Sequence, residues 1–276
     1  MAIKSDLAES VADLKRLYNV EATIEYTSRN GLVRTLRTFL ENRDIFLDHT
    51  VLITKFPRRI FDTGEDNILT FPWKGKFLYF RNSETLISTM AGRPHETLSM
   101  EIDHLLYDKV KGMNCQMDFS STGRAQASLG ILNKAPDMSW GPSGVGYATC
   151  ILEVGMTESL RALDIDAQRW IKNEPSHVTQ AITVKIYPRR EEMIFAVWRS
   201  STPRQPVRDH EVRITKHGGR PRVVSHNRTL RLSFQKIFER LATPDTRERD
   251  VIIFTARELC SIALKVWKEL DLGRRG

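Results

Sequence analysis

A glutamate stands inside the most strand-like run of the sequence, Ala148-Thr149-Cys150-Ile151-Leu152-Glu153-Val154-Gly155. The run is apolar enough for a strand in the centre of a sheet. A buried carboxylate costs several kcal/mol to desolvate unless it pairs with a cation or binds a metal. Glu153 therefore predicts one of two things: a structural role, at a wetted strand end or paired with Arg161, or a metal site.

Two further residues could complete a metal site. Asp137 follows Pro136 at the start of a neighbouring predicted strand, and carboxylates on adjacent strands can share a hard divalent cation. Lys185 lies in the run Ile182-Thr183-Val184-Lys185-Ile186, where alternation places it on the face opposite the three aliphatic residues. A metal lowers the pKa of a bound water and neutralises developing charge, while a lysine positions or stabilises the water. Acids and a lysine around a metal would therefore suit phosphodiester hydrolysis.

The order of these features resembles the PD-(D/E)XK nuclease superfamily, which has the restriction-endonuclease-like fold. More narrowly, it is similar to bacterial proteins classed as restriction endonucleases and to uncharacterised fungal relatives. The motifs that carry the resemblance are Ala135-Pro136-Asp137, Ile151-Leu152-Glu153-Val154-Gly155 and Glu158-Ser159 with Leu163. The resemblance covers about residues 93–200. It implies a metal-dependent nuclease acting on DNA or RNA, with Asp137 and Glu153 as ligands of Mg²⁺ or Mn²⁺.

The sequence departs from the family pattern at the lysine. The family's lysine stands two residues after the glutamate, where this chain has Gly155. A migrated lysine is known in the superfamily, and Lys185 is the candidate if its strand pairs with that of Glu153. If Lys185 points elsewhere, the site binds metal without cutting or is a relic. The alternative function is then a catalytically inactive nucleic-acid-binding or protein-interaction module on the same fold.

The family pattern also includes an acid on the helix before the strands. We expect Glu96 in this role, because His95-Glu96 opens a predicted helix as such a motif often does. Glu101 is the alternative. His95 itself is expected to be a first-turn surface residue rather than a ligand.

The elements that must position these residues predict an α/β protein. The expected core has a mixed central sheet flanked by helices, with an N-terminal α+β elaboration and a C-terminal strand–helix extension. The chain divides into residues 1–92, 93–200 and 201–276, the last a basic extension packing on the core. Helical periodicity favours helices at 5–18, 31–40, 94–113, 158–172 and 256–270. Strand patterns occur at 51–53, 77–80, 114–119, 135–140, 148–155, 178–187, 193–198, 230–234 and 251–254.

The basic charge is concentrated in the C-terminal part. The whole chain has a formal charge of +8, yet residues 199–276 hold 18 Lys and Arg against 9 Asp and Glu. Arginine suits phosphate because its planar fork donates two parallel hydrogen bonds. The predicted nucleic-acid-binding residues are Arg204, Arg208, Arg213, Arg220, Arg222 and Arg228. The other interpretation of this stretch is a solvated loop. Within it, Gly218-Gly219-Arg220-Pro221-Arg222 resembles the core of an AT-hook, although we favour a plain turn at this segment.

Composition excludes several other classes. With 41% hydrophobic and 28% charged residues, the 276-residue chain has the composition of a globular protein with a real core. No apolar run reaches the roughly 18–20 residues that a membrane span needs, and the N-terminus lacks the apolar core of a secretory signal. We therefore expect an intracellular protein, nuclear or cytoplasmic, with nucleic acid as partner and no membrane partner. A homodimer is compatible with the sequence.

Overall fold

A seven-stranded mixed sheet forms the centre of the computed structural model, which describes residues 10–62, 75–124 and 127–274. Its strand order is β13, β12, β11, β10, β9, β8, β5, and only β9 and β10 pair in parallel within it. The strands are β5 (Phe119–Ser121), β8 (Met138–Pro142), β9 (Cys150–Gly155), β10 (Gln180–Tyr187), β11 (Glu192–Ser200), β12 (Pro206–His217) and β13 (Arg220–Val223).

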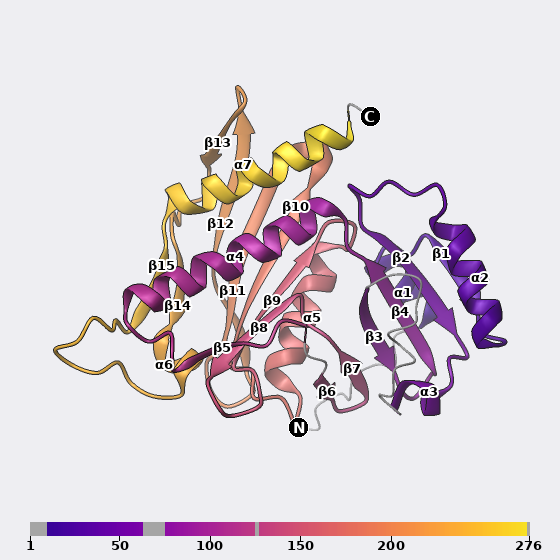
Figure 1. Cartoon of the computed structure of the whole chain (residues 1–276), viewed down its shortest axis with the longest axis horizontal. Helices are drawn as coiled ribbons and strands as arrows, with labels where there is room; N and C mark the ends of the chain where they lie inside the picture. Colours follow the sequence, from indigo (N-terminus) through magenta and orange to yellow (C-terminus); the bar gives the residue numbers. More distant parts are fainter. Residues whose placement is uncertain (1–9, 63–74, 125–126, 275–276) are drawn as a thin grey trace.

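Helices cover both faces of this central sheet (Figure 1). Helices α4 (Arg93–Gly112) and α7 (Ala256–Gly273) lie side by side on one face, and α5 (Leu160–Lys172) covers the other. Strand alternation explains the division, because Leu152 and Val154 of β9 pack into the cluster with α4 and α7. Ile151 points the other way and packs with α5. Glu153 shares this second face.

A second sheet lies beside the core and is built mostly from the N-terminal part (Figure 1). Its six strands run in the order β1, β2, β4, β3, β7, β6. They are β1 (Ala22–Glu25), β2 (His49–Thr54), β3 (Lys76–Phe80), β4 (Thr85–Met90), β6 (Ala127–Leu129) and β7 (Leu132–Lys134). Helix α2 (Arg29–Leu40) packs on this sheet, since Leu32 and Leu36 share a core cluster with Val51 and Ile53. Strands β6 and β7 are inserted between β5 and β8 along the chain, so the two sheets are interleaved in sequence.

The remaining elements complete the core. Strands β14 (Leu230–Ser233) and β15 (Val251–Phe254) pair as a small antiparallel sheet whose inner residues join the α4–α7 cluster. The short helices are α1 (Val11–Leu17), α3 (Arg58–Asp62), α6 (Phe234–Phe238) and the 3₁₀ turn η1 (Pro188–Arg190). In the described part of the chain, no helix combines the length and the apolar composition that crossing a bilayer requires.

The predicted α/β class, with a mixed central sheet flanked by helices, is confirmed. The expected succession of helix, three strands, helix and strand is present as α4, β5, β8, β9, α5 and β10, but two strands that were not predicted, β6 and β7, stand between β5 and β8. The three-part division of the chain stays a prediction. The start of the helix expected at 5–18 lies outside the described residues, which place α1 at Val11–Leu17.

One strand prediction was wrong, and so was the alternative interpretation of the basic stretch as a loop. Residues 114–118 are not a strand, because Asn114 takes the left-handed conformation (φ 61°) that ends α4, and strand pairing begins only at Phe119. The basic stretch after residue 200 is not a loop, since β12 and β13 extend the central sheet by pairing with β11 and with each other. Its alternation, with Val212 and Ile214 buried between polar residues, is the signal that identifies the strand.

Candidate functional site: a buried charge network

Asp137 and Glu153 lie close together, as their adjacent strands predict, and both side chains are completely buried. The backbone NH of Val154, next to Glu153, donates to Asp137 Oδ2 at 2.7 Å, which fixes the aspartate against β9. On the other side, the indole of Trp170 in α5 donates to Glu153 Oε1 at 2.5 Å. Two buried carboxylates in one place need cations close by.

The cation between the two acids is Lys76 of β3, which belongs to the second sheet. Its Nζ lies 3.0 Å from Asp137 Oδ2, 2.5 Å from Glu153 Oε2 and 3.7 Å from Glu158 Oε1. Only 6% of the lysine is exposed. Burial alone would lower the pKa of this lysine, but the surrounding carboxylates outweigh burial and hold the pKa well above its ordinary value. Lys76 is therefore charged and neutralises the acids directly.

A second lysine compensates the other oxygen of Glu153. Lys134 of β7 lies 3.2 Å from Glu153 Oε1 and donates to Asp166 Oδ2 at 2.5 Å. Asp166, on α5, also accepts hydrogen bonds from Tyr18 and Arg169. Burial opposes the charged form of Asp166, but Lys134 and Arg169 lower its pKa. The second sheet thus supplies both lysines that face Glu153.

His95, at the first turn of α4, pairs with the remaining oxygen of Asp137. Its Nε2 lies 3.0 Å from Asp137 Oδ1, and its Nδ1 lies 3.0 Å from Asp48 Oδ2. Burial opposes the charge of the ring, but the two carboxylates outweigh burial and raise its pKa to about 10. Asp48 is held in turn by the backbone NH groups of Gly92 and Met156. The expectation that His95 is a surface residue was wrong, since the ring is completely buried.

These contacts form one buried network in which acids and cations alternate. We call it the charge network; its members in order are Asp48, His95, Asp137, Lys76, Glu153, Lys134, Asp166 and Arg169. Four acids face four cations, so the network is balanced within itself. The structural interpretation of Glu153 is thus present, but its partners are Lys76 and Lys134 rather than Arg161.

Glu158 stands at the border of the network. It is buried just before α5, and burial, which exceeds the opposing effects of Lys76 and Lys134, raises its pKa to about 7. Among the described residues, the cation in contact with it is Lys76, at 3.7 Å. Glu158 is therefore the least compensated acid of this region.

Lys185 lies on the predicted face but outside the charge network. The parallel register places it opposite Gly155, and Thr183 opposite Glu153, so the expected pairing of β9 with β10 is confirmed. Its Nζ donates to the carbonyl of Met156 at 2.6 Å, and burial lowers its pKa to about 8. A Cβ at Gly155 would lie 3.1 Å from Leu163 of α5, so a lysine at the usual position would require the Leu163 side chain to shift.

The helix acids are not brought to Asp137 and Glu153. Glu96 pairs with Arg124 and its side chain is 41% exposed. Glu101 pairs with Lys265 of α7 at 2.7 Å, on the opposite face of the core. Among the four predicted catalytic residues, the structure therefore places Asp137 and Glu153 together, Lys185 on the same sheet face, and Glu96 apart.

The residues as arranged do not fit a divalent metal. A metal bridging Asp137 and Glu153 would need the space where the ammonium of Lys76 lies between their oxygens. Within the described ranges, no three His, Cys, Asp or Glu side chains converge as a metal would require. The ammonium supplies the positive charge that a metal would otherwise supply.

The six predicted nucleic-acid-binding arginines fall into two groups. Arg204 pairs with Glu174, Arg208 with Glu211, and Arg213 with Glu192, at 2.7 to 2.8 Å. The other three, Arg220, Arg222 and Arg228, are exposed, and no described carboxylate pairs with them. The second group is therefore free to contact phosphate.

Arg220 and Arg222 are presented by a protruding hairpin (Figure 1). Gly218 and Gly219 connect β12 to β13 with φ of 56° and 78°, the left-handed values that a two-residue hairpin turn of type I′ requires. The segment that resembles an AT-hook is thus a paired strand preceded by a plain turn. Alternation in β13 leaves both arginines outside.

The sequence did not reveal the cations of the charge network. Lys76 and Lys134 each belong to a short strand, where alternation places them on the same face as the buried Leu78 and Leu132, and this placement is the signal of a buried lysine. The signal does not identify the partner, because Lys76 is 61 residues from Asp137 along the chain. Their meeting depends on how the second sheet packs against the core.

Comparisons with known proteins add one similarity of fold. No family model matches the chain, and no curated protein matches it. Among solved structures, the chain is similar to a proposed nuclease of the family DUF820 from Anabaena variabilis, with 12% identity and a TM-score of 0.44. The similarity covers 72% of this chain and 97% of the other. At this level it assigns neither a family nor an activity.

Proposed function

We propose that the chain is a nucleic-acid-binding protein on a restriction-endonuclease-like fold, and that its buried acids are structural rather than catalytic. One observation carries the second part of the proposal: the ammonium of Lys76 lies between Asp137 and Glu153, within 3.0 Å of both. Because each carboxylate oxygen already faces a cation or an NH group, the acids are compensated without a metal. A water molecule that attacks a phosphodiester would have to displace a buried ion pair to reach Asp137 and Glu153.

Binding to nucleic acid is supported by the arginines of the hairpin. Arg220 and Arg222 project from β13 without acidic partners among the described residues, and Arg228 is exposed six residues further along. Free guanidinium groups on a protruding element can reach phosphates, whereas Arg204, Arg208 and Arg213 would first have to give up their ion pairs. The interface should therefore centre on the hairpin and depend strongly on salt.

A metal-dependent nuclease is the second candidate, favoured by the gathering of an aspartate, a glutamate and a lysine in one place. The resemblance implies such a set, and here Lys76 rather than Lys185 contacts both acids. In this candidate Asp137 and Glu153 would hold the metal, and the metal would neutralise charge on the phosphate. It requires the ammonium to leave the space between the carboxylates.

A metal titration combined with cleavage assays separates the two candidates. Calorimetry of the full chain with Mn²⁺ should show no binding, and single-stranded DNA, duplex DNA and RNA should stay intact with Mg²⁺ or Mn²⁺. Mn²⁺ binding and cleavage that both vanish in Glu153→Gln, but persist in the matched control Glu25→Gln, would establish the nuclease instead. Glu25 is a suitable control because its side chain is 57% exposed and pairs with Lys55 on the surface.

A further inference from the structure

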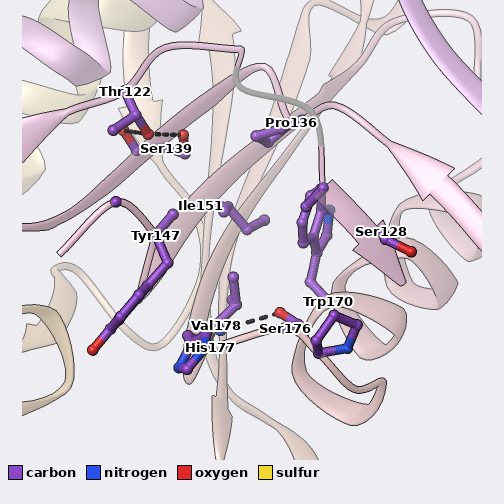
Figure 2. Close-up of a pocket in the computed structure, with 14 residues that line it drawn as sticks. Thr122, Ser128, Pro136, Ser139, Tyr147, Ile151, Trp170, Ser176, His177 and Val178 are labelled. Atoms are coloured by element: carbon purple, nitrogen blue, oxygen red, sulfur yellow. Dashed lines mark hydrogen bonds between the residues drawn. The ribbon is translucent and has the colours of Figure 1, made fainter. Parts of the chain in front are cut away.

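Figure 2 shows a small pocket, and its lining residue Trp170 contacts Glu153 of the charge network. Pro136 and Ile151 line the pocket. Pro136 immediately precedes Asp137, and Ile151 lies two residues before Glu153. Trp170 lines it as well, while its indole NH donates to Glu153. The wall of the pocket is therefore held in place by the same residues that hold the buried acids.

The size of the pocket limits what it can take. Its volume is about 180 Å³. Pockets for drug-sized ligands span about 300–1,000 Å³, whereas an apolar cavity of roughly 150 Å³ accommodates benzene. The pocket thus has room for a single small ring system.

Aromatic rings flank this space. The rings of Tyr147 and His177 stack on each other with centroids 3.9 Å apart. Figure 2 shows these two rings on one side of the pocket and Trp170 on the other, with Ile151 between them. Planar apolar surfaces of this kind favour a flat ligand that stacks.

The polar side chains of the pocket include hydroxyls and one imidazole. The described residues that line it include no Asp, Glu, Lys or Arg. The hydroxyls of Thr122 and Ser139 already bond to each other at 2.5 Å, and Ser176 accepts a hydrogen bond from Val178. Ser128 and the ring nitrogens of His177 have no hydrogen-bond partner among the described residues, so they remain available to a ligand. A neutral flat ring with polar edges fits this chemistry.

A second, more open pocket adjoins the first and contains cationic groups. The two share Ser176, His177 and Val178. The second is also lined by Lys236, whose ammonium donates to the carbonyl of Ser200 at 3.0 Å and has no described carboxylate as partner. Arg204, which pairs with Glu174 at 2.8 Å, and Glu239, which accepts a hydrogen bond from the hydroxyl of Tyr147, line the same pocket. Lys236 is thus the cation of this pocket that can meet an anion next to the flat ring without giving up an ion pair.

We propose that the pocket between Tyr147 and Trp170 binds one nucleobase, with the attached phosphate at Lys236. The base belongs to a single-stranded nucleic acid or to a free nucleotide, since both present a flat base with an attached phosphate. Its insertion would place one unpaired base beside the charge network, while the hairpin arginines hold other phosphates of the same strand. For a single-stranded nucleic acid, this assignment rests on the proposed function, because the hairpin arginines would hold its other phosphates. For a free nucleotide it does not, because the pocket alone would bind it.

Binding of matched oligonucleotides to the full chain tests the proposal. Fluorescence anisotropy would compare a single-stranded oligonucleotide with an abasic one of equal length, and AMP would be used as competitor. The wild-type chain should prefer the base-containing strand. The double variant Tyr147→Ala/His177→Ala should bind that strand about fivefold more weakly or worse and lose the preference, because one stacked base is removed. Tyr147→Phe is the control, since it keeps the ring and removes only the hydroxyl bond to Glu239.

The possible results assign failure to the pocket or to the proposed function. Equal binding of both oligonucleotides by wild type, or unchanged binding in the double variant, overturns the pocket and leaves nucleic-acid binding in place. If no oligonucleotide binds, the proposed function fails, and direct titration with AMP decides the pocket. AMP binding that the double variant loses and Tyr147→Phe retains supports the nucleobase site; no AMP binding overturns it. Circular dichroism of each variant confirms that it is folded.

Discussion

Lys76 Nζ lies 3.0 Å from Asp137 Oδ2, although the two residues belong to different parts of the fold. Lys76 is in the second sheet, whereas Asp137 immediately precedes β8 of the central sheet. The same ammonium lies 2.5 Å from Glu153 Oε2. The contact therefore joins the second sheet to the carboxylates at the centre of the core. It also decides how these carboxylates are neutralised.

Replacing the central cation should destabilise the fold strongly. Lys76→Met keeps the length of the side chain but leaves Asp137 and Glu153 buried with fewer cations. Breaking a buried pair typically costs about 3–5 kcal/mol, and we expect a loss of this size in the free energy of unfolding measured with urea at pH 7. Lys55→Met is the matched control, because Lys55 pairs with Glu25 on the surface and should cost less than about 1 kcal/mol.

A double variant checks the cause of this loss. Adding Glu153→Gln to Lys76→Met removes one uncompensated charge and should recover part of the lost stability. Additive losses in the double variant would show that Lys76 acts through packing rather than through its charge on Glu153.

The charge of His95 predicts a loss of stability at alkaline pH. Its pKa is about 10 in the fold against an ordinary value of 6.5, so the folded state binds the proton more tightly. The resulting stabilisation is complete below pH 6.5 and is lost as pH rises through about 10. Urea unfolding at pH 6, 8 and 10 should show a decline on the order of 2–4 kcal/mol in wild type that His95→Gln lacks. Parallel pH profiles of the two proteins would contradict a charged His95.

Lys185 should behave in the opposite sense. Burial lowers its pKa from 10.5 to about 8, so the charged form is disfavoured in the fold. This penalty is complete below pH 8 and fades as pH rises to 10.5. Lys185→Met should therefore stabilise the protein at pH 7, by about 1–3 kcal/mol, with the gain shrinking toward pH 10.5. Destabilisation at pH 7 would mean that the hydrogen bond from Lys185 to Met156 outweighs the burial of its charge.

The sequence predicts the carboxylates better than their partners. Asp137 and Glu153 could be identified because Pro136 and an apolar strand mark their local setting, and adjacent strands then bring them together. Lys185 could be placed on its face because strand alternation is a local property. To place Glu153 and Lys185 on the same face of the sheet, it was therefore enough to assume that their two neighbouring strands pair.

The cations could not be predicted in the same way. Lys76 reaches the acids because the second sheet packs against the core, and this packing depends on contacts between segments far apart in sequence. His95 shows the same limit: its position at the start of α4 is local, but its buried partner Asp48 is 47 residues away along the chain. Gly155 indicates that the lysine stands elsewhere, but the sequence does not reveal that Leu163 packs against its usual position.

The hairpin arginines should control binding to nucleic acid. Arg220→Glu/Arg222→Glu should weaken binding to duplex DNA in anisotropy assays, because the exposed guanidinium groups would no longer meet phosphate. The slope of log affinity against log salt should become shallower by about 0.9 for each phosphate that is no longer neutralised, and so by about 1.8 for two phosphates. Arg34→Glu/Arg37→Glu on α2 changes the net charge equally at a distant, exposed helix and is the matched control. If both double variants weaken binding alike, the attraction comes from the overall charge, and the hairpin is not the interface.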